Sequence, residues 1–183
     1  IMIEGYNRAP GEPVPVPGYN TADADYFPAM GIPLLRGRLF QETDTGESLR
    51  VVIIDQFLAR RYWPDKDPIG ATIRRGVDPD SLPFTIIGVV GSVKTGELTE
   101  QNPVGLLYFH YKQVPPRSMH LVMKTAREGD PVLGAVRREA ARLDSELPLY
   151  DAKTMEERLE RSLLARRASM VLCLVFAGLA VLL

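Results

Sequence analysis

The segment GVVGSVKT, residues 88–95, places Lys94 and Thr95 where a phosphate-binding loop of the form G-x-x-x-x-G-K-[ST] would use them. In such a loop, backbone N–H groups and the lysine hold the phosphates of a nucleotide. Val93, however, stands where the second glycine is needed, and its Cβ obstructs the backbone cradle. The residues after Thr95 also do not continue as a helix, whose N-terminus would attract phosphate. We therefore expect no nucleotide here, because a strand that leaves a sheet through a turn explains the same residues.

Two pairs of carboxylates have the spacing of a calcium loop or an acid/base pair: Asp65 with Asp67, and Asp78 with Asp80. Both pairs lie beside prolines in predicted turns, where aspartate is favoured because its side chain accepts backbone N–H groups. The chain has no D-x-D-x-D-G loop and no serine, histidine and acid set with a nucleophile elbow. The sequence therefore predicts no catalytic residues.

The residue types that bind metals or react with oxidants are few. His110 and His120 lie near predicted strands without an acidic or histidine partner at ligand spacing, so we interpret them as satisfied or exposed strand residues. The one cysteine, Cys173, lies in an apolar segment, which excludes intrachain disulfides and thiolate sites from residues 1–167. We predict no metal site and no cofactor.

The distribution of charge excludes a broad nucleic-acid binder. The 183 residues include 22 Lys and Arg and 23 Asp and Glu, a formal net charge of -1, so no overall field would gather polyanions. None of these charged residues lies beyond Arg167, and the last 16 positions are ASMVLCLVFAGLAVLL. The chain therefore joins a charged globular part, large enough for one or two small domains, to an apolar segment.

The elements that would position these residues alternate between strands and helices. Val51–Ile54 is predicted as a buried strand followed by a helix that Asp55 caps and Pro64 ends. Helical spacing of apolar residues between 131 and 144 predicts a second helix. Further strands are expected at residues 84–94, 105–111, 119–125 and 147–151, with the first of these in the middle of a sheet. The pattern predicts an α/β (α+β) mixed sheet with two strand–helix–strand units, around Asp55 and around residues 131–144.

The segments outside these units are interpreted as loops and turns. Four prolines between residues 5 and 18 exclude a helix or central strand there. Residues 24–37 predict a short helical turn closed at Gly31, an extended piece and a turn at Gly37, and residues 41–50 predict a solvated loop.

A long helix is predicted at the end of the chain. Thr154 and Glu157 fit a capping box, in which the two residues satisfy each other's backbone N–H groups at a helix start. No proline or glycine follows until Gly178, so this helix can continue into the apolar segment from Ala168 as a rigid link of about 45 Å. We predict a stalk helix at 154–167 and the start of a transmembrane helix at 168–183.

Arg166 and Arg167 would lie at the membrane interface, where long basic side chains contact lipid headgroups. A span needs about 20 residues, and this apolar run is still apolar where the sequence stops at Leu183. Because Ile1 is also not a translation start, we expect the sequence to be a fragment of a longer protein.

Four segments together resemble the MacB-like periplasmic core domain joined to the start of an FtsX-like permease domain. They are ADYFPAMGIPLLRGRLF, VVIIDQFLARRYWPDKDPIGATIRR, FTIIGVVGSVKTGEL and LYDAKTMEERLERSLLARR, in the order of the family and across most of residues 19–183. The resemblance implies an N-terminally truncated periplasmic core domain at 1–153, the extracytoplasmic part of an ABC transporter permease. It also implies a bacterial inner-membrane protein with residues 1–167 in the periplasm.

In this family the permease acts as a homodimer or an internally duplicated pseudo-dimer, and a separate or fused ABC ATPase moves the stalks and periplasmic domains. The resemblance thus implies export or mechanotransmission, with nucleotide bound on another domain and the lipid bilayer as a partner. The segment between the strands is short for the additional subdomain of macrolide-exporter members, which argues against contact with a periplasmic adaptor.

Another feature favours a different topology. Five basic residues precede the apolar segment, and the positive-inside rule alone would place them in the cytoplasm: Lys153, Arg158, Arg161, Arg166 and Arg167. A membrane-anchored extracytoplasmic sensor or binding module is the alternative function. Residues after Leu183 would distinguish the two, because a permease continues with further apolar spans and a sensor with a signalling segment.

Overall fold

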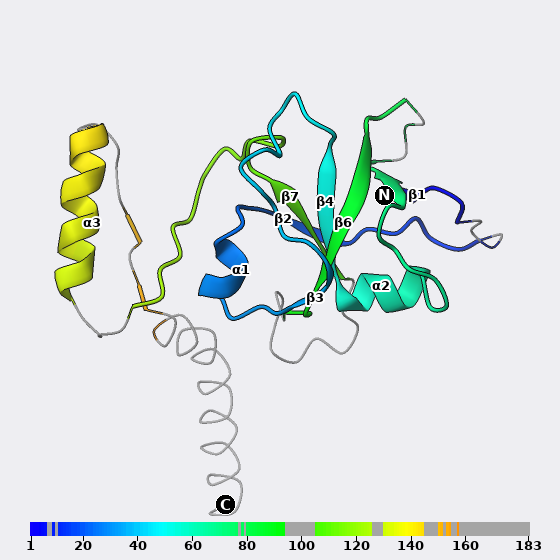
Figure 1. Cartoon of the computed structure of the whole chain (residues 1–183), viewed down its shortest axis with the longest axis horizontal. Coiled ribbons are helices and arrows are strands. Elements are labelled where there is room, and N and C mark those ends of the chain that lie inside the picture. Colours follow the sequence, from blue (N-terminus) through cyan, green and yellow to red (C-terminus); the bar gives the residue numbers. More distant parts are fainter. Residues whose placement is uncertain are drawn as a thin grey trace, which may run out of the picture. The chain divides into compact units, whose positions relative to one another are not determined.

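Figure 1 shows the strands of a mixed sheet in a computed structural model of the chain. Runs of valine and isoleucine form its central strands, β4 (Val51–Asp55) and β6 (Pro83–Val90). The structure describes residues 1–6, 9, 11–76, 78, 80–93, 105–125, 130–144, 150–151, 153–154 and 157. The chain divides into two compact units, residues 1–124 and 125–183. The predicted boundary at residue 153 stays a prediction.

The first unit is a seven-stranded sheet in the order β1-β5-β6-β4-β7-β2, with β3 paired to β6 beside this path. Two neighbouring pairs are parallel, β4 with β6 and β2 with β7, and the other pairs are antiparallel. The predicted mixed sheet is therefore confirmed. The strands are β1 (Met2–Ile3), β2 (Gly18–Ala22), β3 (Leu34–Gly37), β4 (Val51–Asp55), β5 (Thr72–Arg74), β6 (Pro83–Val90) and β7 (Leu106–His110).

The unit around Asp55 forms as the sequence predicts. All five residues of β4 are buried, and Asp55 Oδ1 accepts the backbone N–H of Leu58 at 2.9 Å, which caps α2 (Gln56–Tyr62). The chain then returns through β5 to β6, which lies parallel to β4 and contacts three other strands. The prediction that β6 lies in the middle of the sheet is confirmed.

Each face of the sheet has its own hydrophobic core, because successive side chains of a strand point to opposite faces. Leu58 of α2 packs with Val52, Ile54 and Phe109 on one face. Phe27 of α1 (Tyr26–Ala29) packs with Ile53 and Tyr108 on the other. The two helices accordingly lie on different sides of the central strands in Figure 1.

One predicted strand is absent from the structure, and one strand of the structure was not predicted. Residues 119–125 form no strand: Met119, Leu121 and Met123 are exposed, because their alternating pattern has no neighbouring strand to pair with in the described part of the chain. Gly18–Ala22, for which the sequence pattern predicts no strand, is instead β2. The second strand–helix–strand unit therefore lacks its first strand.

The second unit contains α3 (Asp130–Leu143), which confirms the predicted second helix. Most of the predicted strand at 147–151 and nearly all of the predicted stalk and transmembrane segments lie outside the described residues. Among the residues that are described, no helix has the length and apolar character to cross a membrane.

Candidate functional site

The residues that the sequence singled out for chemistry lie apart in the structure. Gly88 is buried within β6 and faces the backbone of Arg38, and the chain from Gly91 to Val93 is irregular. Lys94 and Thr95 lie outside the described residues. The segment therefore begins as a central strand, as the strand-and-turn interpretation expects.

In each carboxylate pair, one aspartate accepts a backbone hydrogen bond within its own turn. Asp67 Oδ1 accepts the backbone N–H of Ile69 at 3.0 Å, and Asp78 Oδ1 accepts that of Asp80 at 2.9 Å. In the described part of the chain, no group of three His, Cys, Asp or Glu residues could hold a metal ion.

The helix-start residues make the two hydrogen bonds of a capping box. The N–H of Thr154 donates to Glu157 Oε2 at 3.0 Å, and the N–H of Glu157 donates to Thr154 Oγ1 at 3.1 Å. Nearby, the ammonium of Lys153 pairs with the carboxylate of Asp151. Arg166 and Arg167, the predicted membrane-interface residues, lie outside the described residues.

A polar cluster that the sequence pattern does not predict lies where loop 41–50 meets the turn after β7. Its members are Arg38, Asp44, His110 and Gln113, and the last three are at least 92% buried. Arg38 donates two hydrogen bonds to the Asp44 carboxylate, at 2.7 and 2.9 Å, and the N–H of Gln41 adds a third at 2.8 Å. These donors hold the pKa of Asp44 below its usual range, with the Arg38 guanidinium as the main cause.

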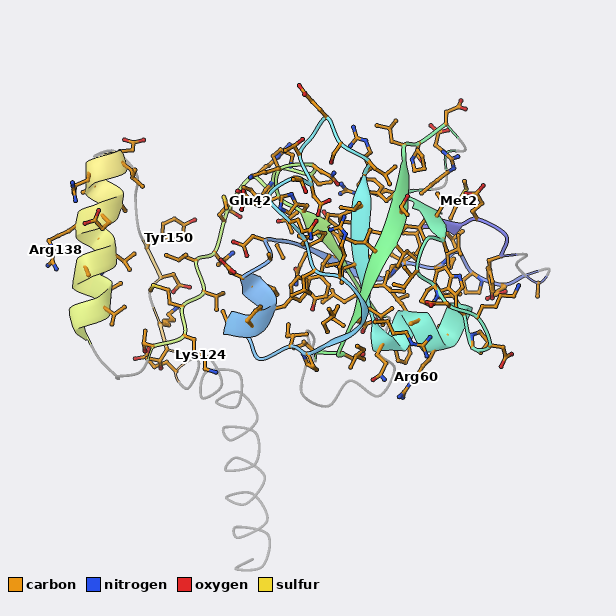
Figure 2. All side chains as sticks on the ribbon, viewed as in Figure 1. Met2, Glu42, Arg60, Lys124, Arg138 and Tyr150 are labelled. Carbon is orange, nitrogen blue, oxygen red and sulfur yellow. The ribbon has the colours of Figure 1, made fainter. Side chains whose placement is uncertain are left out.

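Gln113 also binds loop 41–50, through hydrogen bonds of its side chain. Its Nε2 group donates to the carbonyls of Thr45 and Leu49, at 3.0 and 2.9 Å, and contacts the Ser48 hydroxyl at 3.2 Å. At the surface, Lys112 forms an ion pair with Glu42, which is labelled in Figure 2 and lies on the same loop. Most residues of loop 41–50 are exposed, as expected for a solvated loop, and several polar contacts also bind the loop to the sheet.

His110 lies under this loop, against the Phe40 ring at 5.1 Å between ring centres. Burial lowers its pKa, which the negative charge of Asp44 partly opposes. Its Nδ1 atom has no hydrogen-bond partner among the described residues, so the expectation of a satisfied or exposed histidine is wrong for His110. His120 is exposed, as expected.

Chemically, the cluster stabilises a loop. The carboxylate, guanidinium and amide groups bind one another or the backbone, and no serine, threonine or cysteine among the described residues is hydrogen-bonded to His110 Nδ1. Its signal in the sequence is weak, because Asp44 and Gln113 are far apart and each looks like an ordinary turn residue.

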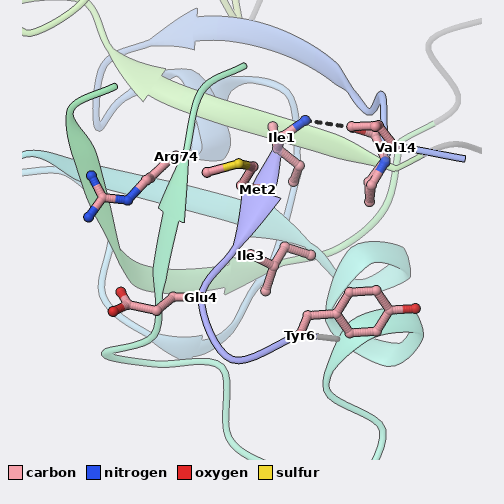
Figure 3. Close-up of a pocket in the computed structure, with 8 residues that line it drawn as sticks. Ile1, Met2, Ile3, Glu4, Tyr6, Val14 and Arg74 are labelled. Atoms are coloured by element: carbon pink, nitrogen blue, oxygen red, sulfur yellow. Dashed lines mark hydrogen bonds between the residues drawn. The ribbon is translucent and has the colours of Figure 1, made fainter. Parts of the chain in front are cut away.

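A surface hollow of about 370 Å³ lies at the start of the chain (Figure 3). Its wall includes Met2, Tyr6 and Arg74, and the N-terminal amine of Ile1 donates to the Pro15 carbonyl beside it at 2.6 Å. Arg74 donates to the carbonyl of Ser81 at 2.7 Å. The wall thus combines apolar side chains with the Glu4 carboxylate, the Tyr6 phenol and an arginine that is already hydrogen-bonded.

Comparison with known proteins gives a consistent family. The sequence model described as "MacB-like periplasmic core domain" matches residues 3–140. The "Macrolide export ATP-binding/permease protein MacB" of Neisseria gonorrhoeae is 42% identical over 65 residues, which are 36% of this chain and 10% of that protein. The MacB 2 protein of Aeromonas hydrophila is 31% identical over 120 residues, which are 64% of this chain and 18% of that protein. The chain therefore spans less than a fifth of the length of these relatives.

Solved structures that match this chain include three extracytoplasmic or permease domains. The periplasmic region of MacB from Actinobacillus actinomycetemcomitans has 22% identity and a TM-score of 0.46, covering 66% of this chain and 54% of that one. The extracellular domain of the transporter YknZ from Gram-positive bacteria has 20% identity and a TM-score of 0.45, with coverages of 68% and 61%. A domain of a permease protein from Porphyromonas gingivalis has 14% identity and a TM-score of 0.49, with coverages of 86% and 75%.

Proposed function

The chain belongs to the family of MacB-like periplasmic core domains, and from this premise we propose that it is the moving extracytoplasmic part of an ABC transporter permease. In this proposal an ABC ATPase, as a separate subunit or a fused domain, hydrolyses ATP in the cytoplasm. The permease then transmits the motion to residues 1–167 on the periplasmic side of a bacterial inner membrane, for export or for action on an envelope partner. The family match over residues 3–140 is the observation that supports it most strongly.

The stalk is the element through which we propose the motion to pass. The capping-box hydrogen bonds between Thr154 and Glu157 support a helix start there, and the sequence from Thr154 to Ala177 contains no proline or glycine to break it. We propose that residues 154–167 form the stalk and that the transmembrane helix starts at 168. Arg166 and Arg167 would contact lipid headgroups where the helix enters the bilayer.

The polar contacts that hold loop 41–50 to the first unit support the proposal that this unit moves as a rigid body. Loop 41–50 is tied to the sheet by Asp44 and Gln113, so a force applied to the domain would not be lost in deforming this loop. Nucleotide chemistry belongs to the ATPase in this proposal, and the domain itself needs no catalytic group. The two copies of a homodimer, or the two halves of a pseudo-dimer, would move together.

The side of the membrane can be tested with one engineered cysteine. Cys173 is the only cysteine in the given sequence, so single-site labelling needs a background in which Cys173 and any cysteine outside this sequence are replaced by alanine. His120 is exposed, and a His120→Cys variant of the full-length protein should react with a membrane-impermeant maleimide in cells whose outer membrane has been permeabilised. Labelling only after the inner membrane is opened would overturn the proposed location and favour the topology that the five basic residues indicate.

Transmission through the stalk can be tested separately. A proline in a helix interior destabilises the helix by about 3 kcal/mol, so Leu163→Pro should interrupt the stalk without altering the sheet. We expect the full-length variant to retain surface labelling at position 120 and to lose the activity that depends on the ATPase. Leu163→Ala is the matched control, since alanine preserves the helix. Full activity of Leu163→Pro would show that the stalk does not transmit motion.

A further inference from the structure

Two arginines lie over aromatic rings of the sheet. On the face where α2 packs, Phe84 and Phe109 are 95% and 99% buried, and their ring centres are 4.8 Å apart. The guanidinium of Arg50 lies 5.8 Å from the centre of the Phe84 ring. That of Arg75 lies 5.8 Å from the centre of Phe109 and 4.6 Å from that of Tyr19. We call these five residues the arginine-covered face.

The strand register places all five on the same side of the sheet. Tyr19 pairs with Leu107, which belongs to the core under α2 together with Phe84 and Phe109. Arg50 lies two residues before Val52 and Arg75 two residues after Ile73, and both of these belong to the same core. The face is thus the continuation of the α2 side of the sheet, toward the start of β4 and the end of β5.

In the part of the chain that the structure describes, neither guanidinium of this face has a charged partner. The Arg50 and Arg75 side chains make no hydrogen bond or ion pair to the described residues, whereas the side chains of Arg38 and Arg74 are both hydrogen-bonded. A guanidinium that lies over an aromatic ring keeps N–H donors available for a carboxylate, and it is less strongly hydrated than an ammonium group. The face therefore presents two oriented, unpaired cations.

The rim of the face is apolar and exposed. Leu82, two residues before Phe84, is 57% exposed, and Tyr19 is 56% exposed. Arginine and tyrosine on an apolar surface are the residues that dominate the binding energy of protein interfaces. A partner that fits would offer carboxylates to the arginines and aliphatic side chains to the rim.

We propose that the arginine-covered face docks an acidic peptide segment of another protein, whose carboxylates pair with Arg50 and Arg75. The charge complementarity of two unpaired guanidiniums is the argument for a carboxylate-bearing occupant, and the leucine rim is the argument for a peptide with aliphatic residues. This inference goes beyond the proposed function, because it names the chemistry of a partner. It also does not depend on coupling to an ATPase.

The test uses the whole chain in detergent and two synthetic peptides. The first peptide contains Asp, Glu, Leu and Gly, and the second replaces every Asp by Asn and every Glu by Gln. We expect the acidic peptide to bind at least about tenfold more tightly than its neutral isostere, a difference of about 1.4 kcal/mol. The double variant Arg50→Gln/Arg75→Gln should lose this preference, and added salt should weaken binding of the acidic peptide.

A charge-matched control separates the face from general attraction. Arg36→Gln/Arg60→Gln removes the same charge from exposed positions on β3 and α2, away from the arginine-covered face, and should leave peptide binding unchanged. If Arg50→Gln/Arg75→Gln unfolds the sheet, the test uses Arg50→Lys/Arg75→Lys, which keeps the charge. We expect this variant to bind the acidic peptide more weakly than the native chain.

Four outcomes would overturn the proposal. The first is equal binding of the two peptides, and the second is an equal effect of the two double glutamine variants on binding. In the third, the peptide does not bind, and the chain self-associates in a way that Arg50→Gln/Arg75→Gln abolishes. In the fourth, the chain binds phosphatidylglycerol vesicles and not the peptide. The last two would identify a second copy or a lipid surface as the occupant.

Discussion

The backbone N–H of Val51 donates to the side-chain oxygen of Gln113 at 2.9 Å, although the two residues are 62 positions apart. Val51 begins the central strand β4, and this bond completes the set that Gln113 makes with loop 41–50. One buried side chain therefore fixes both the loop and the start of the strand that follows it.

Gln113→Ala should destabilise the first unit by about 2–3 kcal/mol, because it leaves the buried N–H of Val51 without its partner and removes a hydrogen bond from each of two loop carbonyls. Urea unfolding followed by tryptophan fluorescence would measure the loss, since the chain has one tryptophan, Trp63. Lys112→Ala is the neighbouring control: its ion pair with Glu42 is at the surface, and a much smaller change is expected. Equal effects of the two changes would contradict the role given to Gln113.

Asp44→Asn should destabilise the unit by about 1–3 kcal/mol, since it weakens the two charge-assisted hydrogen bonds from Arg38. The lowered pKa of Asp44 makes its contribution present above about pH 4 and lost as the pH falls further. As the pH falls below 4, the free energy of unfolding of the variant should therefore decrease less than that of the native chain. Asp67→Asn, in an exposed turn that asparagine also suits, is expected to change neither quantity.

His110→Phe should reduce the dependence of stability on pH between neutral and mildly acid conditions. Burial lowers the pKa of His110 in the folded chain. Below about pH 6.5 the His110 imidazole therefore binds a proton in the unfolded chain but stays neutral in the folded chain. Stability of the native chain should therefore fall as the pH drops below this value. Phenylalanine does not titrate, so melting temperatures of the variant should be flatter from pH 7 to pH 5. A parallel decline in both proteins would exclude His110 as the cause.

Gly88→Ala should destabilise the sheet by about 1–3 kcal/mol, because the added Cβ would lie 2.4 Å from the carbonyl oxygen of Arg38. That atom belongs to the backbone, so it cannot move aside as the end of a side chain could. Gly46→Ala is the matched control, since its nearest neighbour would be 3.5 Å away, and a change within about 0.5 kcal/mol is expected. Circular dichroism melting curves of the two variants would show whether the difference exists.

The sequence predicts the parts of this fold that depend on neighbouring residues. Val51–Ile54 and Asp55 determine a strand and a capped helix through their own side chains, and the structure has both. Residues 119–125 have an alternating pattern, but a strand also needs a partner, and pairing is not encoded in the segment itself.

The residues of the polar cluster and of the arginine-covered face could not be assembled from the sequence for a related reason. Gln113 reaches Val51, and Arg75 reaches Tyr19, only after distant strands have taken their places in the sheet. Neither pair leaves a local spacing that could have been recognised beforehand.

Strand β2 lies at one end of the sheet's order and pairs in parallel with β7, Gly18 opposite Leu106 and Ala22 opposite His110. A chain is synthesised from its N-terminus, so β2 exists long before the strand that completes its hydrogen bonds. Closing so long a loop costs conformational entropy, so we expect this pairing to form late in folding. Until it forms, β2 of a newly made chain would be open to proteases and to other unfolded chains.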